Sequence, residues 1–142
     1  MKTKLNLLAV GIFLAAVNAG FGQSTLQFST ATYTVAESAG TATLSVRRLN
    51  DANMLVSVNF ATADGTATNG LKYTATNGTQ SFAAGETNQT IVVPILNNGI
   101  VDGAKNFKVI LSNPTNAVLG TPTTNTVSIT DNDVGISFQF AT

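Results

Sequence analysis

The stretch 55–67, LVSVNFATADGTA, decides the fold of this chain. Its apolar residues Val56, Val58 and Phe60 alternate with small or polar residues, which is the period of a β-strand with one buried face. The run then stops at Asp64-Gly65, a pair that favours a turn. The stretch therefore predicts a strand that packs one face against a second sheet and has a carboxylate just beyond its end.

The same pattern recurs along the chain. After a first run that ends near Val35, further short alternating runs bounded by turn residues cover 41–49, 55–62, 79–82, 90–96, 106–111 and 126–130. No segment after residue 22 keeps a helical period. Pro94 predicts an edge strand, because proline cannot donate to a sheet ladder. Seven such runs predict an all-β fold, a seven-stranded antiparallel sandwich.

Most acidic residues follow directly after a run. If successive strands are antiparallel, the odd-numbered runs all end at one pole of the sandwich. The acidic residues of that pole are Glu37, Asp64, Asp102, Asp131 and Asp133. Asp51 and Glu86 belong to the opposite pole. Because crowded carboxylates repel unless a cation lies among them, and calcium takes several oxygen ligands, the arrangement predicts a calcium site.

The first residues predict export. Lys2 and Lys4 precede an apolar stretch over 5–17 and small residues up to Gly22, the layout of a secretory signal peptide. An uncleaved anchor is the alternative, although the apolar stretch is below the about 18 residues expected of a membrane span. We therefore expect a signal peptide at 1–22, the sandwich domain at 23–133, and a secreted or cell-surface location.

The end of the chain echoes the first strand. FQFAT at 138–142 repeats the spacing of FSTAT at 28–32, directly after the last acidic motif. Residues 134–142 are thus predicted to be a linker or the start of a following repeat. The expected partners are neighbouring repeat modules or other surface proteins, in an adhesive or structural array. Membrane contact is expected only through the signal segment or an anchor in a longer parent chain.

Charge and composition exclude several function classes. Without Lys2 and Lys4 the basic residues number 7 − 2 = 5 against 7 acidic ones, so the net charge is 5 − 7 = −2. No nucleic-acid footprint is present, and Arg47-Arg48 is predicted to be a solvated edge. With no Cys and no His, disulfides, the usual zinc ligands and the commonest general base are absent. Hydrolysis by Glu37 and Asp64 is disfavoured, since no long loop could form a lid, and we expect no enzyme.

Seven landmarks occur in a specific order. They are YTVAES at 33–38, FATADGTA at 60–67, YTATNG at 73–78, FAAGET at 82–87, VPI at 93–95, FKVILS at 107–112 and ITDND at 129–133. In these the chain resembles the Calx-beta domain, the calcium-binding module of sodium–calcium exchangers and of many exported proteins. The resemblance covers roughly 26–133 and implies an immunoglobulin-like Greek-key sandwich.

The resemblance also implies the calcium ligands. They are Glu37, Asp64, Asn97, Asn98, Asp102, Asp131 and Asp133. Asn97 and Asn98 stand where the family commonly has aspartates, and Lys72 and Lys105 where it commonly has acids. An Asn carbonyl can still bind calcium but adds no charge, so we expect one occupied site, or two, with a dissociation constant of roughly 10⁻⁴ to 10⁻³ M.

A calcium-free reading stays open beside this one. The domain could have lost calcium and serve as a structural spacer with a degenerate metal site. In that case Lys105 could replace the metal by pairing with Asp131 or Asp64, because any cation relieves carboxylate repulsion.

Overall fold

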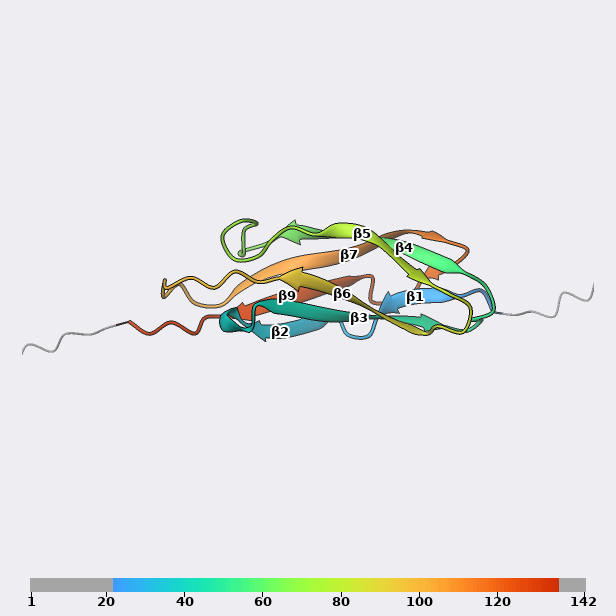
Figure 1. Cartoon of the computed structure of the whole chain (residues 1–142), viewed down its shortest axis with the longest axis horizontal. Coiled ribbons are helices and arrows are strands. Elements are labelled where there is room, and N and C mark those ends of the chain that lie inside the picture. Colours follow the sequence, from blue (N-terminus) through green and yellow to red (C-terminus); the bar gives the residue numbers. More distant parts are fainter. Residues whose placement is uncertain (1–21, 136–142) are drawn as a thin grey trace, which may run out of the picture.

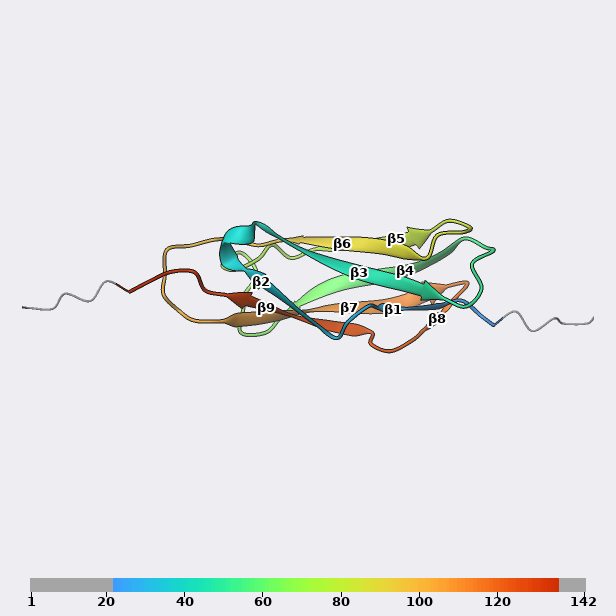
Figure 2. The same cartoon turned by 90° about the horizontal axis from the view of Figure 1, so that it is seen from below.

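The computed structural model describes residues 22–135 and shows a sandwich of nine strands (Figures 1 and 2). The strands are β1 (Thr25–Phe28), β2 (Thr32–Ala36), β3 (Thr41–Leu49), β4 (Val56–Asp64), β5 (Asn77–Phe82), β6 (Asn88–Pro94), β7 (Lys105–Thr115), β8 (Val118–Leu119) and β9 (Thr124–Thr130). One 3₁₀ turn, η1 (Glu37–Ala39), follows β2. Within these residues, no helix is long and apolar enough to cross a membrane. The predicted signal segment up to residue 21, and Phe138 and Phe140, lie outside the described residues.

The strands form two sheets, in the orders β6-β3-β1-β8 and β2-β9-β7-β4-β5. The all-β immunoglobulin-like sandwich is as predicted, but it has nine strands in the described part and not seven. The first run is divided, because Phe28 pairs with β3 in one sheet whereas Thr32 pairs with β9 in the other. The additional β8 has only two residues, too few for an alternating pattern to reveal it.

The core is built from the alternating positions that the sequence indicates. Phe28, Phe82 and Phe107 are fully buried, while Phe60 is only partly buried. Pro94 ends β6, which is the outer strand of its sheet, so the predicted edge position is confirmed. Each buried phenyl ring contributes roughly 1.5–3 kcal/mol relative to exposure, and the domain can fold without disulfides on this apolar interior.

One pole collects the ends of four strands. β2 runs parallel to β9, and β7 runs antiparallel to both β9 and β4, so β2, β4 and β9 end on the same side. β6 also ends there, because Pro94 pairs with Thr41 just after η1. We call the loops and side chains at this end the acidic pole; it is also where the chain leaves the sandwich after β9 (Figure 1).

The opposite pole contains a buried arginine. Arg48 is 2% exposed, so the prediction of a solvated edge is wrong for this residue. Its Nε and Nη2 donate to Ser24 Oγ at 3.2 and 3.0 Å, and Nε also donates to the Asp51 carbonyl at 3.0 Å. Its Nη1 donates to the Ala83 carbonyl at 3.3 Å. The guanidinium thus joins Ser24, the residue before β1, to the loops after β3 and β5.

Replacing Arg48 with methionine keeps the apolar stem and removes these donors. We expect the free energy of unfolding to fall by about 1–3 kcal/mol, since buried acceptors lose charge-assisted hydrogen bonds. Chemical denaturation checks this value. Arg47→Met, at an exposed neighbouring position, is the control and should change stability by less than about 0.5 kcal/mol. Equal effects of the two substitutions would contradict the structural role of Arg48.

Candidate functional site: the acidic pole

Glu37 is the buried centre of the acidic pole. It begins η1 directly after β2, and Gly40, with φ of 75°, closes this turn in the left-handed conformation that suits glycine. The Glu37 side chain is 1% exposed. Its Oε1 accepts hydrogen bonds from Lys72 Nζ at 2.9 Å and from the Asn98 backbone N–H at 3.2 Å. Its Oε2 has no hydrogen-bond donor among residues 22–135.

Asp131 joins the end of β9 to the loop between β6 and β7. Its Oδ2 accepts the backbone N–H groups of Asp102 at 2.8 Å and Gly103 at 2.7 Å, and its Oδ1 accepts that of Asp133 at 2.8 Å. These hydrogen bonds, first the one from Asp133 and then the one from Gly103, hold the pKa of Asp131 below its ordinary value. The carboxylate is therefore ionised at neutral pH.

Three carboxylates converge at this point. One oxygen each of Glu37, Asp131 and Asp133 lie within 4.8 Å of one another. Two oxygens bound to the same calcium ion can be at most about 4.6–5.2 Å apart, because each lies 2.3–2.6 Å from the ion. Asp133 Oδ2 is buried and, like Glu37 Oε2, lacks a donor in the described part of the chain. The three carboxylates are anionic oxygen ligands, and two of them have an oxygen that accepts no hydrogen bond in the described residues. Such ligands fit calcium.

Lys72 is the residue that the sequence-based site did not include. It lies in the loop between β4 and β5, is 5% exposed, and places Nζ 2.9 Å from Glu37 Oε1 and 3.0 Å from Asp102 Oδ1. Burial by itself lowers the pKa of Lys72, but the hydrogen bonds and charges of Glu37 and Asp102 outweigh burial and raise it. Lys72 is thus a buried ammonium between two carboxylates.

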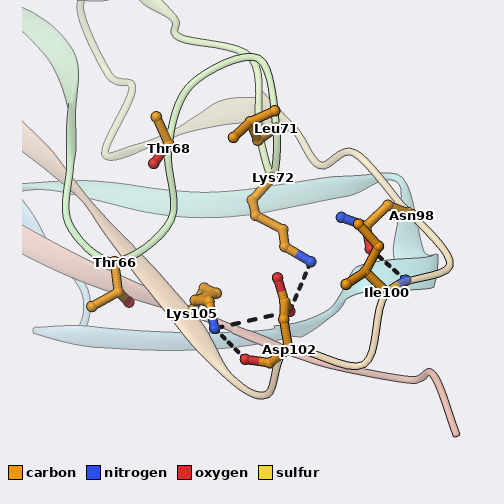
Figure 3. A pocket seen from close by; sticks show the side chains of 8 residues that line it. All are labelled: Thr66, Thr68, Leu71, Lys72, Asn98, Ile100, Asp102 and Lys105. Atoms are coloured by element: carbon orange, nitrogen blue, oxygen red, sulfur yellow. Dashed lines mark hydrogen bonds and ion pairs between the residues drawn. The ribbon is translucent and has the colours of Figure 1, made fainter. Parts of the chain in front are cut away.

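Lys105 has a more peripheral role. Its Nζ lies 3.9 Å from Asp102 Oδ1 and donates to the Asp102 carbonyl (Figure 3). The sequence-based alternative in which Lys105 pairs with Asp131 or Asp64 is therefore wrong, because Lys105 pairs with Asp102. The buried cation of the pole is Lys72. The two lysines line an open pocket of about 200 Å³ whose rim includes exposed Leu71 and Ile100.

Asp64 lies at the same pole but is held by other partners. Its Oδ1 accepts the Tyr73 hydroxyl at 2.5 Å and the Asn69 backbone N–H at 3.0 Å. Among residues 22–135, Asp64 is not one of the three carboxylates whose oxygens all lie within 4.8 Å of one another. The structure therefore gives Asp64 a positioning role: it fixes the loop that carries Lys72.

The asparagines that the sequence proposes as ligands differ in their placement. Asn98 is half-buried beside Glu37 and lines the pocket with Lys72. Asn97 is exposed, and the structure shows no hydrogen bond from its side chain within the described residues. Of the seven proposed ligands, the structure thus brings Glu37, Asp131 and Asp133 together, with Asp102 and Asn98 beside them, and leaves Asp64 and Asn97 apart.

Tyr73 connects this loop to the core. Its ring is 1% exposed and stacks on Phe107, with the centroids 4.1 Å apart and the planes at 8°. Burial, followed by the hydrogen bond to Asp64, raises the pKa of Tyr73 to about 12. A neutral phenol is therefore part of the folded structure well above the pH at which a free tyrosine ionises.

The raised pKa of Tyr73 predicts a loss of stability in alkali. The stabilising contribution is complete below the ordinary pKa of about 10, where it amounts to about 2–3 kcal/mol at about 1.4 kcal/mol per pKa unit. It is lost as the pH rises from 10 toward 12. Tyr73→Phe keeps the stack on Phe107 and should lose less stability than the unmodified domain between pH 10 and 12. Denaturant titrations at each pH measure the difference; parallel pH profiles would contradict the prediction.

The connected charged side chains of the acidic pole have a net charge of −2. Glu37, Asp102, Asp131 and Asp133 contribute −4, and Lys72 and Lys105 contribute +2, so the connected group has −4 + 2 = −2. One divalent cation at the three converging carboxylates would balance it. The fold and the site together define an immunoglobulin-like β-sandwich module with an acidic pole.

The chain belongs to the Calx-beta domain family, whose model matches residues 22–133. It is 38% identical over 136 residues to sodium/calcium exchanger 1 of Bos taurus, covering 82% of this chain and 14% of that protein. It is 31% identical over 116 residues to the sodium/calcium exchanger Calx of Drosophila melanogaster, covering 81% and 12%. The chain therefore spans only about a seventh of the length of these relatives.

Solved structures of the same kind agree in fold. The apo form of the Calx CBD1 domain superposes with a TM-score of 0.76 and 30% identity, over 78% of this chain and 99% of that one. The two-domain CBD12 of CALX1.2 gives a TM-score of 0.74 and 31% identity, over 77% of this chain and 46% of that one. The second structure shows that a domain similar to this one occurs beside another domain.

Proposed function

We propose that this chain is a non-enzymatic calcium-binding module that takes one calcium ion between Glu37, Asp131 and Asp133. The observation that carries the proposal is the convergence of one oxygen each of Glu37, Asp131 and Asp133 within 4.8 Å. In the same cluster, Glu37 Oε2 and Asp133 Oδ2 are buried without a hydrogen-bond donor in the described residues. Leaving charged oxygens buried and unpaired costs several kcal/mol. A calcium ion bound there would remove this cost.

Lys72 supports one ion and argues against a second. Its ammonium lies between Glu37 and Asp102, where a second cation would otherwise be needed, and the two positive charges would repel. Asn98 adds a carbonyl without charge. We therefore propose binding in the weak extracellular range, with a dissociation constant of roughly 10⁻⁴ to 10⁻³ M.

Calcium titration tests the site. At about 10 mM calcium, 10 to 100 times the proposed dissociation constant, the domain should gain about 1.4–2.7 kcal/mol and melt at a higher temperature. The double substitution Asp131→Asn and Asp133→Asn should abolish this gain and leave the domain folded. A matched control, Asp51→Asn with Glu86→Gln, removes the same charge at the opposite pole and should keep the gain. Calorimetry with no heat and no shift in the unmodified domain would refute calcium binding.

A calcium-free structural module is the second candidate, and Lys72 is the observation that favours it. The lysine already neutralises part of the buried acidic charge, so the domain can fold without a metal ion. In this reading the domain is a spacer, and its melting temperature is the same with calcium as with a chelator.

We further propose that the module is exported and works in an end-to-end array. The signal-like sequence at 1–22 supports export. The described chain enters at the pole of Arg48 and leaves at the acidic pole (Figure 1), so a following module would adjoin the calcium site. The two-domain structures of similar proteins support this context. Recovery of the mature protein in the medium or at the cell surface, with its N-terminus near residue 20–23, tests export.

A further inference from the structure

We propose that Asn98 is a site of spontaneous deamidation, and that the aspartate formed there strengthens calcium binding at the acidic pole. The second part rests on the proposed function; the first part does not. Asn98 is followed by Gly99 in the loop between β6 and β7, and this loop has no regular secondary structure. Three Asn-Gly pairs occur in the described chain, and their surroundings differ in ways that single out this one.

The geometry at Asn98 favours attack on its side-chain amide. Asn98 Oδ1 accepts the Ile100 backbone N–H at 3.0 Å (Figure 3). A side-chain hydrogen bond to the residue two positions on forms an Asx turn, which folds the side chain over the intervening Gly99. The hydrogen bond also withdraws electron density from Cγ. Gly99 is exposed, and its N–H has no hydrogen-bond acceptor within residues 22–135. A Cβ at Gly99 would meet no atom within 4 Å, so Gly99 lies in open space.

The chemistry is balanced with water as the only co-reactant. The Gly99 nitrogen loses its proton to hydroxide and attacks Asn98 Cγ, so that a C–N bond forms and the Cγ–Nδ2 bond breaks. Ammonia leaves, taking up a proton from water, and a succinimide remains. Water then opens the ring at one of its two carbonyls, which yields aspartate or isoaspartate at position 98. One water is consumed and one ammonia released, with no change in oxidation state.

The other two Asn-Gly pairs are protected. At Asn69-Gly70, the Gly70 N–H donates to the Tyr73 carbonyl at 2.8 Å, and Asn69 Oδ1 accepts the Ala75 N–H at 2.7 Å. At Asn77-Gly78, both residues belong to β5 and pair with β4. In both places hydrogen bonds or strand pairing hold the backbone, and these interactions would have to break before the glycine nitrogen could reach Cγ of the asparagine.

The new carboxylate would lie beside the proposed ion. The Asn98 N–H is 3.2 Å from Glu37 Oε1, and the side chain lines the pocket with Lys72 and Asp102. An aspartate at position 98 changes the charge of the connected group from −2 to −3. We expect the calcium dissociation constant to fall by roughly thirtyfold, as a unit charge about 4 Å from a divalent ion produces in a water-rich site.

Mass spectrometry of peptides from the chain aged at mildly alkaline pH tests the modification. Conversion should be fastest at Asn98, slower at Asn77 and slowest at Asn69. Gly99→Ala is the matched control, because the alanine fits without a clash and should suppress conversion at Asn98 alone. Conversion at Asn98 no faster than at Asn77, or unaffected by Gly99→Ala, would overturn the proposal.

Calcium titration of Asn98→Asp tests the consequence. A dissociation constant about thirtyfold below that of the unmodified chain supports it. If the unmodified chain binds calcium and Asn98→Asp binds no more tightly, the consequence is overturned while the proposed function stands. If neither binds calcium, the proposed function fails and the consequence fails with it, whereas the ageing experiment still decides whether Asn98 is modified.

Discussion

Replacing Lys72 with methionine is expected to lower the free energy of unfolding by about 3–5 kcal/mol in calcium-free buffer, because removal of one partner leaves buried charge uncompensated. The ammonium is the buried partner of both Glu37 and Asp102, at 2.9 and 3.0 Å. Methionine has nearly the same length and fills the space without a charge. Denaturant-induced unfolding in the presence of a chelator measures the loss.

Two controls separate charge compensation from packing. Lys105→Met removes a lysine whose side chain is 27% exposed and 3.9 Å from the same carboxylate, and should cost at most about 1 kcal/mol. Adding Glu37→Gln and Asp102→Asn to Lys72→Met removes the uncompensated charge and should recover part of the loss. Calcium should stabilise Lys72→Met more than the unmodified domain, since the pole is then more negative. An unchanged stability of Lys72→Met would show that Lys72 does not neutralise the pole.

The strands could be predicted because their residues obey a local rule. Val56 and Val58 lie on either side of Ser57 on one strand, and Phe107 and Val109 lie on either side of Lys108 on another; all four apolar residues are buried. Alternation needs no knowledge of the partner strand. The division between β1 and β2 could not be predicted this way, since it depends on which sheet each half joins, and that is a long-range choice.

The site could be predicted only where the position of a residue determines its role. Glu37 and Asp131 follow strands that run parallel to each other, so their ends must meet. Lys72 follows no strand, and lysine is almost always exposed; its burial comes from two carboxylates that are 35 and 30 residues away in sequence. Asp64 is the last residue of β4 and lies at the predicted pole, but its Oδ1 accepts the hydroxyl of Tyr73. The spacing of residues in the sequence does not show which partner a carboxylate such as Asp64 will bind in the folded domain.

Replacing Phe107 with alanine is expected to cost about 3–5 kcal/mol, the range for removing a fully buried aromatic ring from a core. The ring has no exposed surface and supports Tyr73 by stacking, and Tyr73 in turn binds Asp64. The substitution should therefore also loosen the loop that carries Lys72. Denaturation measures the first effect, and hydrogen exchange of the Lys72 and Tyr73 amides measures the second.

Phe82→Ala is the matched control, because Phe82 is equally buried but pairs with Val56 near the opposite pole. Both variants should lose similar stability, within the factor of about two that core sites show. Only Phe107→Ala should speed exchange in the loop that carries Lys72 beyond the change explained by global unfolding. In calcium titrations, Phe82→Ala should keep the affinity of the unmodified domain, whereas Phe107→Ala should lose part of it. If both variants change the acidic pole equally, the stack of Tyr73 on Phe107 does not organise the site, and the pole depends on overall stability alone.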